Sequence, residues 1–584
     1  MTTEQKLSYY INKSRELLGK PLGVKIRVGI LCSFTINGLD ETIRVKAAEK
    51  NIDCTTYVGG YNQYNQEILN NESALYKFSP DITFLIIDTR NILGDLYHFP
   101  YSVSSSERKK FVGKKLKEIQ ELANTYTSRT KSKLVIANFN LPTYSPHGIF
   151  ETKTEYGFHQ MIKEINRGLI DLFVNSDFIF VYDFDRFVSQ FGEDNVFDYK
   201  QFFFGDMKIS LERIPYLAND LMGYIIGHLG LSKKCIVLDL DNTLWGGIVG
   251  EDGFNGIRLG PEPSGNTYFE FQKILLSLNQ RGIILAINSK NNYDDALKVI
   301  KEHPYMVLRE EQFASMRINW NDKVSNMKEI INELNIGADS VVFFDDDPVN
   351  QEYMKLNMPE VLTVNLPKDS SQYAQIIKKM NEFSVLNITD EDVKRGKMYF
   401  EQRQRNNFEN SIPDLKSFLK NLELKILIKK ANEFTIPRIS QLTLKTNQFN
   451  LTTKRYQESE IIKFSNDEKY LVGCVQVEDK FGDNGITGVF IIYKNNPKEW
   501  FIDTFLLSCR IMGREIEKGM LGHIINIAKE NGVEQITAQF IASKKNKPIE
   551  DFLQNNGFHK DGNNWIYLLK EQFTIPEYLT VSVE

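Results

Sequence analysis

Short apolar runs alternate with helix-patterned stretches along the first 230 residues. The apolar runs lie at Lys25–Cys32, Ile82–Asp88, Lys133–Asn138 and Phe178–Asp183. Stretches with helical periodicity lie between or beside them, the clearest at Glu107–Tyr126 and Glu155–Val174. Strands that alternate with helices are typical of an α/β domain with a mostly parallel sheet, which we predict for residues 1–230.

A second alternating pattern starts at Ser232. It predicts strands at Cys235–Leu240, Ile283–Asn288 and Ser340–Phe344, with helices near Tyr268–Gln280, Asp294–Glu302 and Lys323–Leu334. We therefore expect a second, Rossmann-like parallel-sheet domain over residues 231–369.

The remaining third of the chain contains two regions with different sequence patterns. Residues 370–422 are charged and helix-patterned, with a helix-capping pattern at Thr389–Asp392, so we predict a helical connector. Residues 423–584 predict an α+β domain with strands at Tyr470–Glu478, Gly488–Tyr493, Trp500–Leu507 and Gln535–Phe540 and a helix at Gly513–Glu530. The whole chain thus reads as an α/β multidomain protein.

Composition narrows the class of protein. The chain has 584 residues, 42% of them hydrophobic and 25% charged, with a net charge of -5. It lacks the basic excess that nucleic-acid or membrane-surface binding usually requires, so we expect neither partner. Five cysteines, none in a Cys-x-x-Cys pair, favour a reducing compartment. With no apolar run of membrane-spanning length and no signal-peptide pattern, we expect a cytoplasmic protein.

The candidate chemistry lies where the predicted strands of residues 231–369 end. The strand at Cys235 ends in Asp239 and Asp241, and Thr243 follows; the next ends in Ser289; Lys323 begins a helix; and the last ends in Asp345 and Asp346. Phosphoryl transfer through an aspartyl-phosphate needs this set: a carboxylate nucleophile, an acid/base, a hydroxyl, a cation and a divalent metal. Oxygen ligands favour Mg²⁺ over zinc. The alternative, a turn of solvated acids, would require three strand ends to imitate the set.

This series resembles the haloacid dehalogenase superfamily of phosphatases. The resemblance implies that Asp239 is the nucleophile and a magnesium ligand, and that Asp241 protonates the leaving oxygen, activates water and offers its backbone carbonyl to the metal. It also implies that Thr243 steadies the loop and that Ser289 and Lys323 hold the phosphoryl oxygens. Of the last pair of acids, Asp346 is the favoured ligand and Asp345 supports the lysine. Little sequence separates the first motif from Ser289, so no large cap domain fits there.

A narrower resemblance rests on Leu240–Gly247, Gly250–Gly253, Lys445–Thr453 and Asp479–Gly485, which are similar to signatures of the FkbH-like family. It implies an enzyme that takes a glyceryl unit from 1,3-bisphosphoglycerate, removes its phosphate and loads glycerate on an acyl carrier protein. Other members are implied in surface-polysaccharide biosynthesis.

Leu506–Phe558 resembles the acyl-CoA-binding half of the GNAT acyltransferase fold. The resemblance implies that Arg510, Gly513 and Asn546 bind a pantetheine arm. Glu515 stands where a small residue is usual, and its charge should repel the pyrophosphate of CoA. We therefore expect phosphopantetheine of a carrier protein rather than CoA, the alternative being a domain that only packs against the phosphatase domain.

The first domain is similar to the SGNH-hydrolase fold, with Ser33 just past the first strand and with Gly59 or Gly60 and Asn138 at the oxyanion-hole positions. Where that family has a histidine base, Gly205–Ser210 has none, so we expect a degenerate binding or assembly module. A thioester on the enzyme would need an accessible thiolate, for which Cys32, Cys235 and Cys509 are candidates, each more simply read as a buried hydrophobe.

Three hypotheses follow. The first is a phosphatase fused to an acyltransferase-like domain that acts on a phosphorylated three-carbon acid, or another small acyl or sugar phosphate, and serves a carrier protein. The second is a phosphatase and acyltransferase acting on a sugar precursor of surface polysaccharide. The third is a non-enzymatic scaffold that binds a carrier protein.

Overall fold

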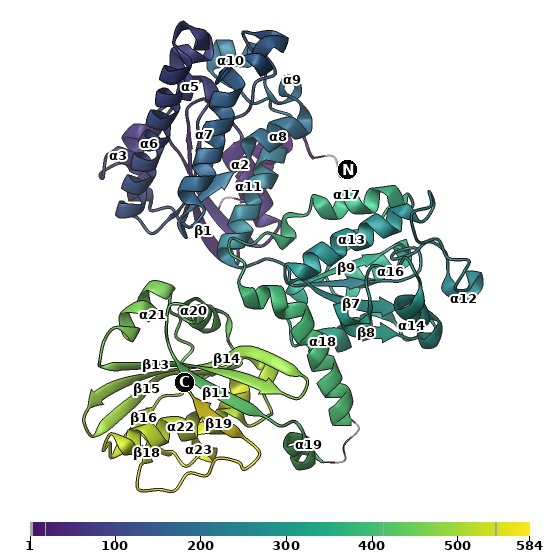
Figure 1. Ribbon diagram of the computed structural model, residues 1–584, viewed down its shortest axis with the longest axis vertical. Coiled ribbons are helices and arrows are strands. Elements are labelled where there is room, and N and C mark those ends of the chain that lie inside the picture. The colour runs from purple at the N-terminus through teal and green to yellow at the C-terminus, as the bar shows by residue number, and fades with distance from the viewer. Residues whose placement is uncertain (1–3, 18, 21, 411, 413, 544–545) are drawn as a thin grey trace. The chain divides into compact units, whose positions relative to one another are not determined.

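The computed structural model describes residues 4–17, 19–20, 22–410, 412, 414–543 and 546–584, and it divides into two compact units (Figure 1). Unit 1 comprises Met1–Leu231 with Ser384–Leu386, and unit 2 comprises Ser232–Phe383 with Asn387–Glu584.

Unit 1 is built on a parallel sheet in the order β2-β1-β3-β4-β5. Its strands are β1 (Val24–Cys32), β2 (Ile52–Val58), β3 (Ile82–Ile86), β4 (Lys133–Ala137) and β5 (Ile179–Tyr182). Side chains alternate between two cores, because successive residues of a strand point to opposite faces. Val28 and Ile30 join a core with α2 (Leu39–Ala48) and α11 (Ile214–Leu229), whereas Leu31 joins one with α6 (Ser105–Arg129) and α7 (Phe158–Phe173).

The remaining helices of unit 1 are short. They are α1 (Leu7–Leu17), α3 (Tyr64–Leu69), α4 (Ala74–Phe78), α5 (Thr89–Leu93), α8 (Phe184–Phe191), α9 (Glu193–Val196) and α10 (Tyr199–Gly205).

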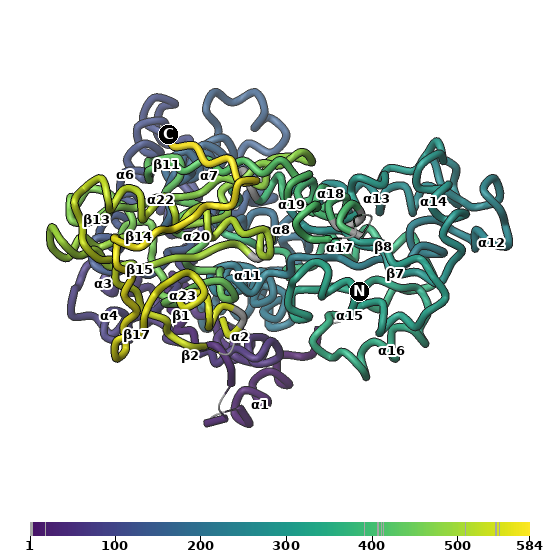
Figure 2. Tube along the Cα trace, turned by 90° about the horizontal axis from the view of Figure 1, so that it is seen from below, coloured from purple at the N-terminus to yellow at the C-terminus, as the bar shows by residue number. Residues whose placement is uncertain are grey.

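Unit 2 begins with a second parallel sheet, in the order β10-β9-β6-β7-β8. Its strands are β6 (Cys235–Leu238), β7 (Ile284–Ser289), β8 (Phe313–Ile318), β9 (Val341–Asp345) and β10 (Leu362–Asn365). Helices α13 (Asn266–Gln280) and α14 (Tyr293–Glu302) share one core with the sheet, and α15 (Lys323–Leu334) and α16 (Pro348–Asn357) share the other. Figure 2 shows these two pairs of helices on opposite sides of β7 and β8.

The helical connector consists of α17 (Tyr373–Lys378), α18 (Asp390–Asn410) and α19 (Leu415–Asn421). The predicted cap precedes α18: Thr389 Oγ1 accepts a hydrogen bond from the N–H of Asp392, and the Asp392 carboxylate accepts one from the N–H of Thr389. Near the other end of the helix, Arg405 makes a buried, bidentate ion pair with Asp479. Its Nε donates to Oδ2 at 2.6 Å, and its Nη2 donates to Oδ1 at 2.8 Å. The connector is thereby tied to the carboxyl-terminal domain.

The carboxyl-terminal domain is a mixed sheet in the order β17-β18-β16-β15-β14-β13-β11-β19, with β12 beside β15. Its strands are β11 (Lys425–Lys430), β12 (Phe449–Asn450), β13 (Tyr470–Asp479), β14 (Gly482–Asn496), β15 (Glu499–Leu507), β16 (Gln535–Ala538), β17 (His559–Asp561), β18 (Asn564–Leu568) and β19 (Thr580–Val583). Helices α20 (Ile436–Lys445) and α21 (Glu458–Ser465) share one core with the sheet, whereas α22 (Ile516–Glu530) and α23 (Phe552–Asn555) share the other.

The mixed α/β fold class predicted from the sequence is confirmed, but the strand prediction was incomplete. The apolar runs did not predict β2, β8 or β10, which lie at the edges of the two parallel sheets. Edge strands are paired on one side only and carry more polar residues, as in Phe-Ala-Ser-Met-Arg-Ile of β8. The predicted helix start at Gly513 was also wrong: α22 begins at Ile516, because Gly513 and Glu515 have left-handed backbone angles, φ +81° and +58°.

Candidate active site

The central strands of the second sheet bring the sequence-predicted acids together. β6 lies between β9 and β7, and the carboxyl ends of parallel strands meet at one edge of the sheet. Asp239 directly follows β6, and its N–H donates a hydrogen bond to the carbonyl of Phe344 in β9 at 3.0 Å. Asp345 ends β9, and Asp346 follows it.

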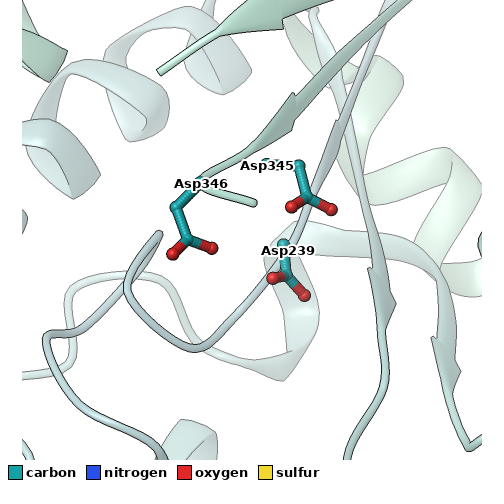
Figure 3. Close-up of side chains that lie close together, drawn as sticks. All are labelled: Asp239, Asp345 and Asp346. Atoms are coloured by element: carbon teal, nitrogen blue, oxygen red, sulfur yellow. The ribbon is translucent and has the colours of Figure 1, made fainter. Parts of the chain in front are cut away.

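Three carboxylates converge at this edge. The side chains of Asp239, Asp345 and Asp346 point toward one another (Figure 3), with ligand oxygens all within 4.8 Å. Burial raises the pKa of Asp346 to about 7, and the neighbouring charges of Asp239 and Asp345 add to the rise. Like charges this close oppose joint ionisation unless a cation lies among them. The set therefore fits a hard divalent cation with oxygen ligands, such as Mg²⁺.

Lys323 places a positive charge beside this carboxylate cluster. Its Nζ donates a hydrogen bond of 2.6 Å to Oδ2 of Asp345 and lies 2.9 Å from Oδ1 of Asp239, an ion pair without hydrogen-bond geometry. Burial alone would lower the pKa of Lys323, but the two carboxylates raise it above its ordinary value. The ammonium is thus held charged, and Oδ1 of Asp239 keeps no hydrogen-bond donor within the described residues.

Asp241 stands apart from the three-carboxylate cluster. Its Oδ1 accepts hydrogen bonds from Trp245 Nε1 at 2.8 Å and from the N–H of Val249 at 3.1 Å, and its Oδ2 accepts one from Asn291 Nδ2 at 2.8 Å. Burial raises the pKa of Asp241, and the charge of Asp239 acts in the same direction. A carboxyl group that is held in one orientation and keeps its proton more readily is suited to act as a general acid.

The turn after β6 explains the Trp-Gly-Gly sequence. Asn242 has a left-handed φ of +53°, and its Oδ1 accepts a hydrogen bond from the N–H of Gly247 at 2.9 Å. Gly247 has φ +96°, and a Cβ there would lie 2.4 Å from Oδ2 of Asp252. Only glycine fits this position without strain. The tight turn brings the indole of Trp245 onto Asp241.

Thr243 and Ser289 are both fully enclosed. The N–H of Thr243 donates to the carbonyl of Leu240, but its Oγ1 has no hydrogen-bond partner among the described residues. We expected Thr243 to stabilise the loop, and the described hydrogen bond that does so comes from its backbone N–H rather than from its hydroxyl. Ser289 ends β7 with 1% of its surface exposed, and its carbonyl accepts a hydrogen bond from the N–H of Asn319.

Sequence reasoning missed two asparagines and the tryptophan of this site. Buried Asn288 donates a hydrogen bond of 2.8 Å to the carbonyl of Lys323 and so fixes the start of α15. Asn291 and Trp245 position Asp241. The signal was present as amides directly after a buried strand, in Asn288-Ser-Lys-Asn291, but only the serine was singled out.

The predicted pantetheine residues make contacts inside the protein. Asn546 is fully buried, and its Nδ2 donates to the carbonyls of Asn450 and Ile541, at 3.0 and 2.9 Å. Both of its N–H groups are therefore used inside the protein. Arg510 donates to Met398 Sδ at 2.8 Å, and Gly513 lies in the turn before α22.

Glu515 lies at the amino-terminal end of α22, as the sequence indicated. Its carboxylate contacts Lys518 Nζ at 2.7 Å and accepts a hydrogen bond from Tyr578. An anion at a helix amino terminus takes the favourable electrostatic position that a pyrophosphate would otherwise occupy.

Two of the three candidate cysteines are unsuited to form thioesters. Cys32 and Cys235 are buried, and burial raises the pKa of both thiols far above the ordinary value. Neither thiol becomes a nucleophilic thiolate near neutral pH. The side chain of Cys509 lies outside the described part of the structure.

Unit 1 holds Ser33 at the carboxyl end of its sheet. Ser33 is 2% exposed, and its Oγ accepts a hydrogen bond of 2.8 Å from the N–H of Asp88. Gly205–Ser210 does reach this edge, since Thr35 pairs with Met207, and it brings Lys208 into a buried ion pair with Asp88. Asn138 instead bonds Asp183 at 2.8 Å. Among the described residues no histidine contacts Ser33, and a degenerate module stays the prediction for this unit.

In the part of the chain that is described, no helix is both long enough and apolar enough to cross a membrane.

Comparison with known proteins gives one family and several similar structures. Residues 27–226 match the family model of FkbH, N-terminal domain. The chain is similar to the N-terminal part of a Bacteroides fragilis protein that contains a phosphatase domain and was solved in complex with Mg. The two are 26% identical, the TM-score is 0.60, and the match covers 66% of this chain and 100% of that one.

Acetyltransferases also match, with much lower scores. The ribosomal-protein-S18-alanine N-acetyltransferase of Escherichia coli is 12% identical, with 26% of this chain and 97% of that chain covered and a TM-score of 0.21. A GNAT-family acetyltransferase of Staphylococcus aureus is 15% identical. The match covers 25% of this chain and 99% of that chain, with a TM-score of 0.20. Scores this low carry no argument about activity. No curated protein matches the chain.

Proposed function

We propose that the carboxylate site is a magnesium-dependent phosphatase of the haloacid dehalogenase type, and the match of residues 27–226 to the FkbH N-terminal domain is consistent with this proposal. One observation carries the proposal: three carboxylates with oxygens within 4.8 Å of one another lie at the carboxyl edge of a parallel sheet, and two of them, Asp239 and Asp345, pair with the buried Lys323. The similar Bacteroides fragilis structure, which contains a phosphatase domain with Mg, supports it.

Asp239 is the proposed nucleophile. Its Oδ1 lies 2.9 Å from the ammonium of Lys323, which orients the carboxylate, and this is the oxygen that would attack phosphorus. The new bond joins Oδ1 to phosphorus while the bond from phosphorus to the leaving oxygen breaks. Lys323 offsets charge on the phosphoryl oxygens, and Ser289 offers them a hydroxyl.

Asp241 is the proposed acid and base. Burial raises its pKa, and in its protonated form it would pass a proton to the leaving oxygen. The resulting carboxylate then takes a proton from water, whose oxygen attacks phosphorus and releases phosphate from Asp239. Trp245 and Asn291 keep the carboxyl group oriented for both transfers.

Asp239, Asp346 and the backbone carbonyl of Asp241 would hold the magnesium ion. When bound, Mg²⁺ neutralises the acidic cluster and polarises a phosphoryl oxygen. Asp345 suits a supporting role better, because its two oxygens already accept hydrogen bonds from Lys323 and from the N–H of Asp347.

The substrate we propose is a phosphoglyceryl donor derived from 1,3-bisphosphoglycerate, with glycerate loaded on an acyl carrier protein. The FkbH match supports this choice. The position of Glu515 at the start of α22 favours a carrier arm over CoA, since an arm lacks the pyrophosphate that this carboxylate would repel. Phosphatase chemistry on a sugar precursor stays the alternative.

The test uses Asp239→Asn and the exposed control Glu262→Gln. We expect Mg²⁺-dependent phosphate release from acetyl phosphate to fall at least about a thousandfold in Asp239→Asn, with an unchanged circular-dichroism spectrum, and to persist in the control. Intact mass of a phosphopantetheinylated carrier protein, incubated with enzyme and 1,3-bisphosphoglycerate, then tests for a glyceryl adduct. Phosphate release that survives Asp239→Asn would reject the phosphatase assignment.

A further inference from the structure

A cavity of about 470 Å³ opens beside the proposed general acid. It is lined by two segments, residues 291–295 at the start of α14 and residues 318–320 at the end of β8. Both segments follow strands of the phosphatase sheet at the edge where Asp239 lies.

Asn291 connects this cavity with Asp241, the proposed general acid. It lines the cavity, and its Nδ2 donates the 2.8 Å hydrogen bond to Oδ2 of Asp241. The acid that protonates the leaving oxygen therefore lies against the cavity wall. A phosphate ester bound at Asp239 would extend its leaving group past Asp241 into this space.

The walls combine aromatic surface with negative charge. Trp320 lines the cavity and is 71% exposed, and its Nε1 donates to Oδ1 of Asn292, another lining residue, at 3.1 Å. Tyr293 is 48% exposed. Asp294 and Asp295 are exposed, and no lysine, arginine or histidine is among the lining residues.

The local charge balance is negative. The two carboxylates carry two full charges, whereas the start of α14 offers only about half a positive charge. Lys290 is exposed but does not line the cavity, and Lys298 lies over the ring of Phe254 instead. A second anion on the substrate would therefore be repelled here, while hydroxyl and amide groups find acceptors and an aromatic platform.

We propose that this cavity binds the leaving group and selects uncharged, polar leaving groups over those that carry a second anion. The inference rests on the proposed phosphatase function and specifies its substrate class. Applied to a phosphoglyceryl unit, it favours the thioester or ester form over the free acid, whose carboxylate would face Asp294 and Asp295. Phosphate removal then follows attachment of the acyl group rather than preceding it.

The experiment compares 3-phosphoglycerate with its methyl ester, a pair that differs at neutral pH by one negative charge on the leaving group. For the wild-type enzyme with Mg²⁺ we expect kcat/KM to favour the ester by about tenfold. Asp294→Asn should reduce this preference to about threefold, chiefly by improving turnover of the free acid. Glu302→Gln, which removes an exposed carboxylate at the far end of the same helix, should keep the wild-type ratio.

Equal kcat/KM values, or a preference for the free acid, would overturn the inference while leaving the phosphatase intact. So would an Asp294→Asn ratio equal to that of Glu302→Gln. Acetyl phosphate tests the phosphatase activity separately from the selectivity of the cavity, since its small leaving group does not depend on the cavity. If the wild-type enzyme released phosphate from none of the three compounds, the proposed function would fail and this inference with it.

Discussion

Asp346 is harder to ionise in the folded protein than an ordinary aspartate, and this makes the metal-free site a source of instability as the pH rises. The pKa of Asp346 is raised from 3.8 to about 7, first by burial and then by the charges of Asp239 and Asp345. A folded-state pKa above the unfolded value means that stability is present at low pH and is lost as pH rises from about 4 to about 7. Asp346→Asn removes the ionisation and should therefore remove this loss.

The magnitude follows from the shift. About three pKa units correspond to roughly 4 kcal/mol at most, at about 1.4 kcal/mol per unit. Asp346 is only half-buried, so solvent screening reduces the figure to about 2 kcal/mol. Asp346→Asn should therefore stabilise the metal-free protein by about 2 kcal/mol at pH 8 and by less at pH 5, where part of the loss has not yet occurred.

Thermal unfolding with a chelator at the two pH values measures the effect. A gain of about 2 kcal/mol should raise Tm at pH 8 by roughly 4–8 °C for a cooperative unit of domain size. Added Mg²⁺ should raise the Tm of the wild-type protein at pH 8 and raise that of the variant less. Glu360→Gln, an exposed control in the same domain, should behave as wild type. A variant no more stable than wild type at pH 8, or one with an unchanged Mg²⁺ response, would refute the reasoning.

Three further substitutions probe the rest of the molecule. Lys323→Met leaves two buried carboxylates without their cation, so we expect the free energy of unfolding to fall by about 3–5 kcal/mol and phosphate release to be lost; urea titration and kinetics measure both, and wild-type values would contradict the ion-pair account. Asp241→Asn should lower kcat/KM, which reports the phosphorylation step, about a hundredfold more for alkyl phosphates than for p-nitrophenyl phosphate, whose leaving group needs no acid; equal losses in kcat/KM would argue against the acid role. Asp479→Asn leaves Arg405 and Arg514 buried with reduced compensation and should cost about 3–5 kcal/mol in urea unfolding, and an effect below 1 kcal/mol would show that the pairs carry little energy.

The convergence of Asp239, Asp345 and Asp346 could be predicted from the sequence because these residues sit at the ends of central strands. Asp239 and Asp345 each follow an apolar run of a buried parallel strand, and such runs are visible without knowledge of the fold. Parallel pairing then brings them together. Edge strands such as β8 gave no such signal, because their sequences mix polar with apolar residues.

The residues that could not be predicted are those whose role depends on side-chain direction. Nothing in the spacing of Asn291 tells that its amide reaches Asp241, fifty residues earlier in the chain. Asn546 shows the reverse error: its position matched a binding motif, yet its side chain is buried and bonded to the backbone. A motif fixes the chain position of a residue, whereas the packed structure fixes what its polar atoms contact.

The most direct test of the central claim is to trap phosphate on Asp239. Asp241→Asn should still be phosphorylated by p-nitrophenyl phosphate with Mg²⁺, but without its base the aspartyl-phosphate should persist. Borohydride reduces such an acyl phosphate to the alcohol, and peptide mass spectrometry then locates the reduced residue. We predict reduction at position 239 and at no other acid. A burst of p-nitrophenol without reduction at position 239, or with reduction elsewhere, would contradict the assignment of Asp239 as the nucleophile.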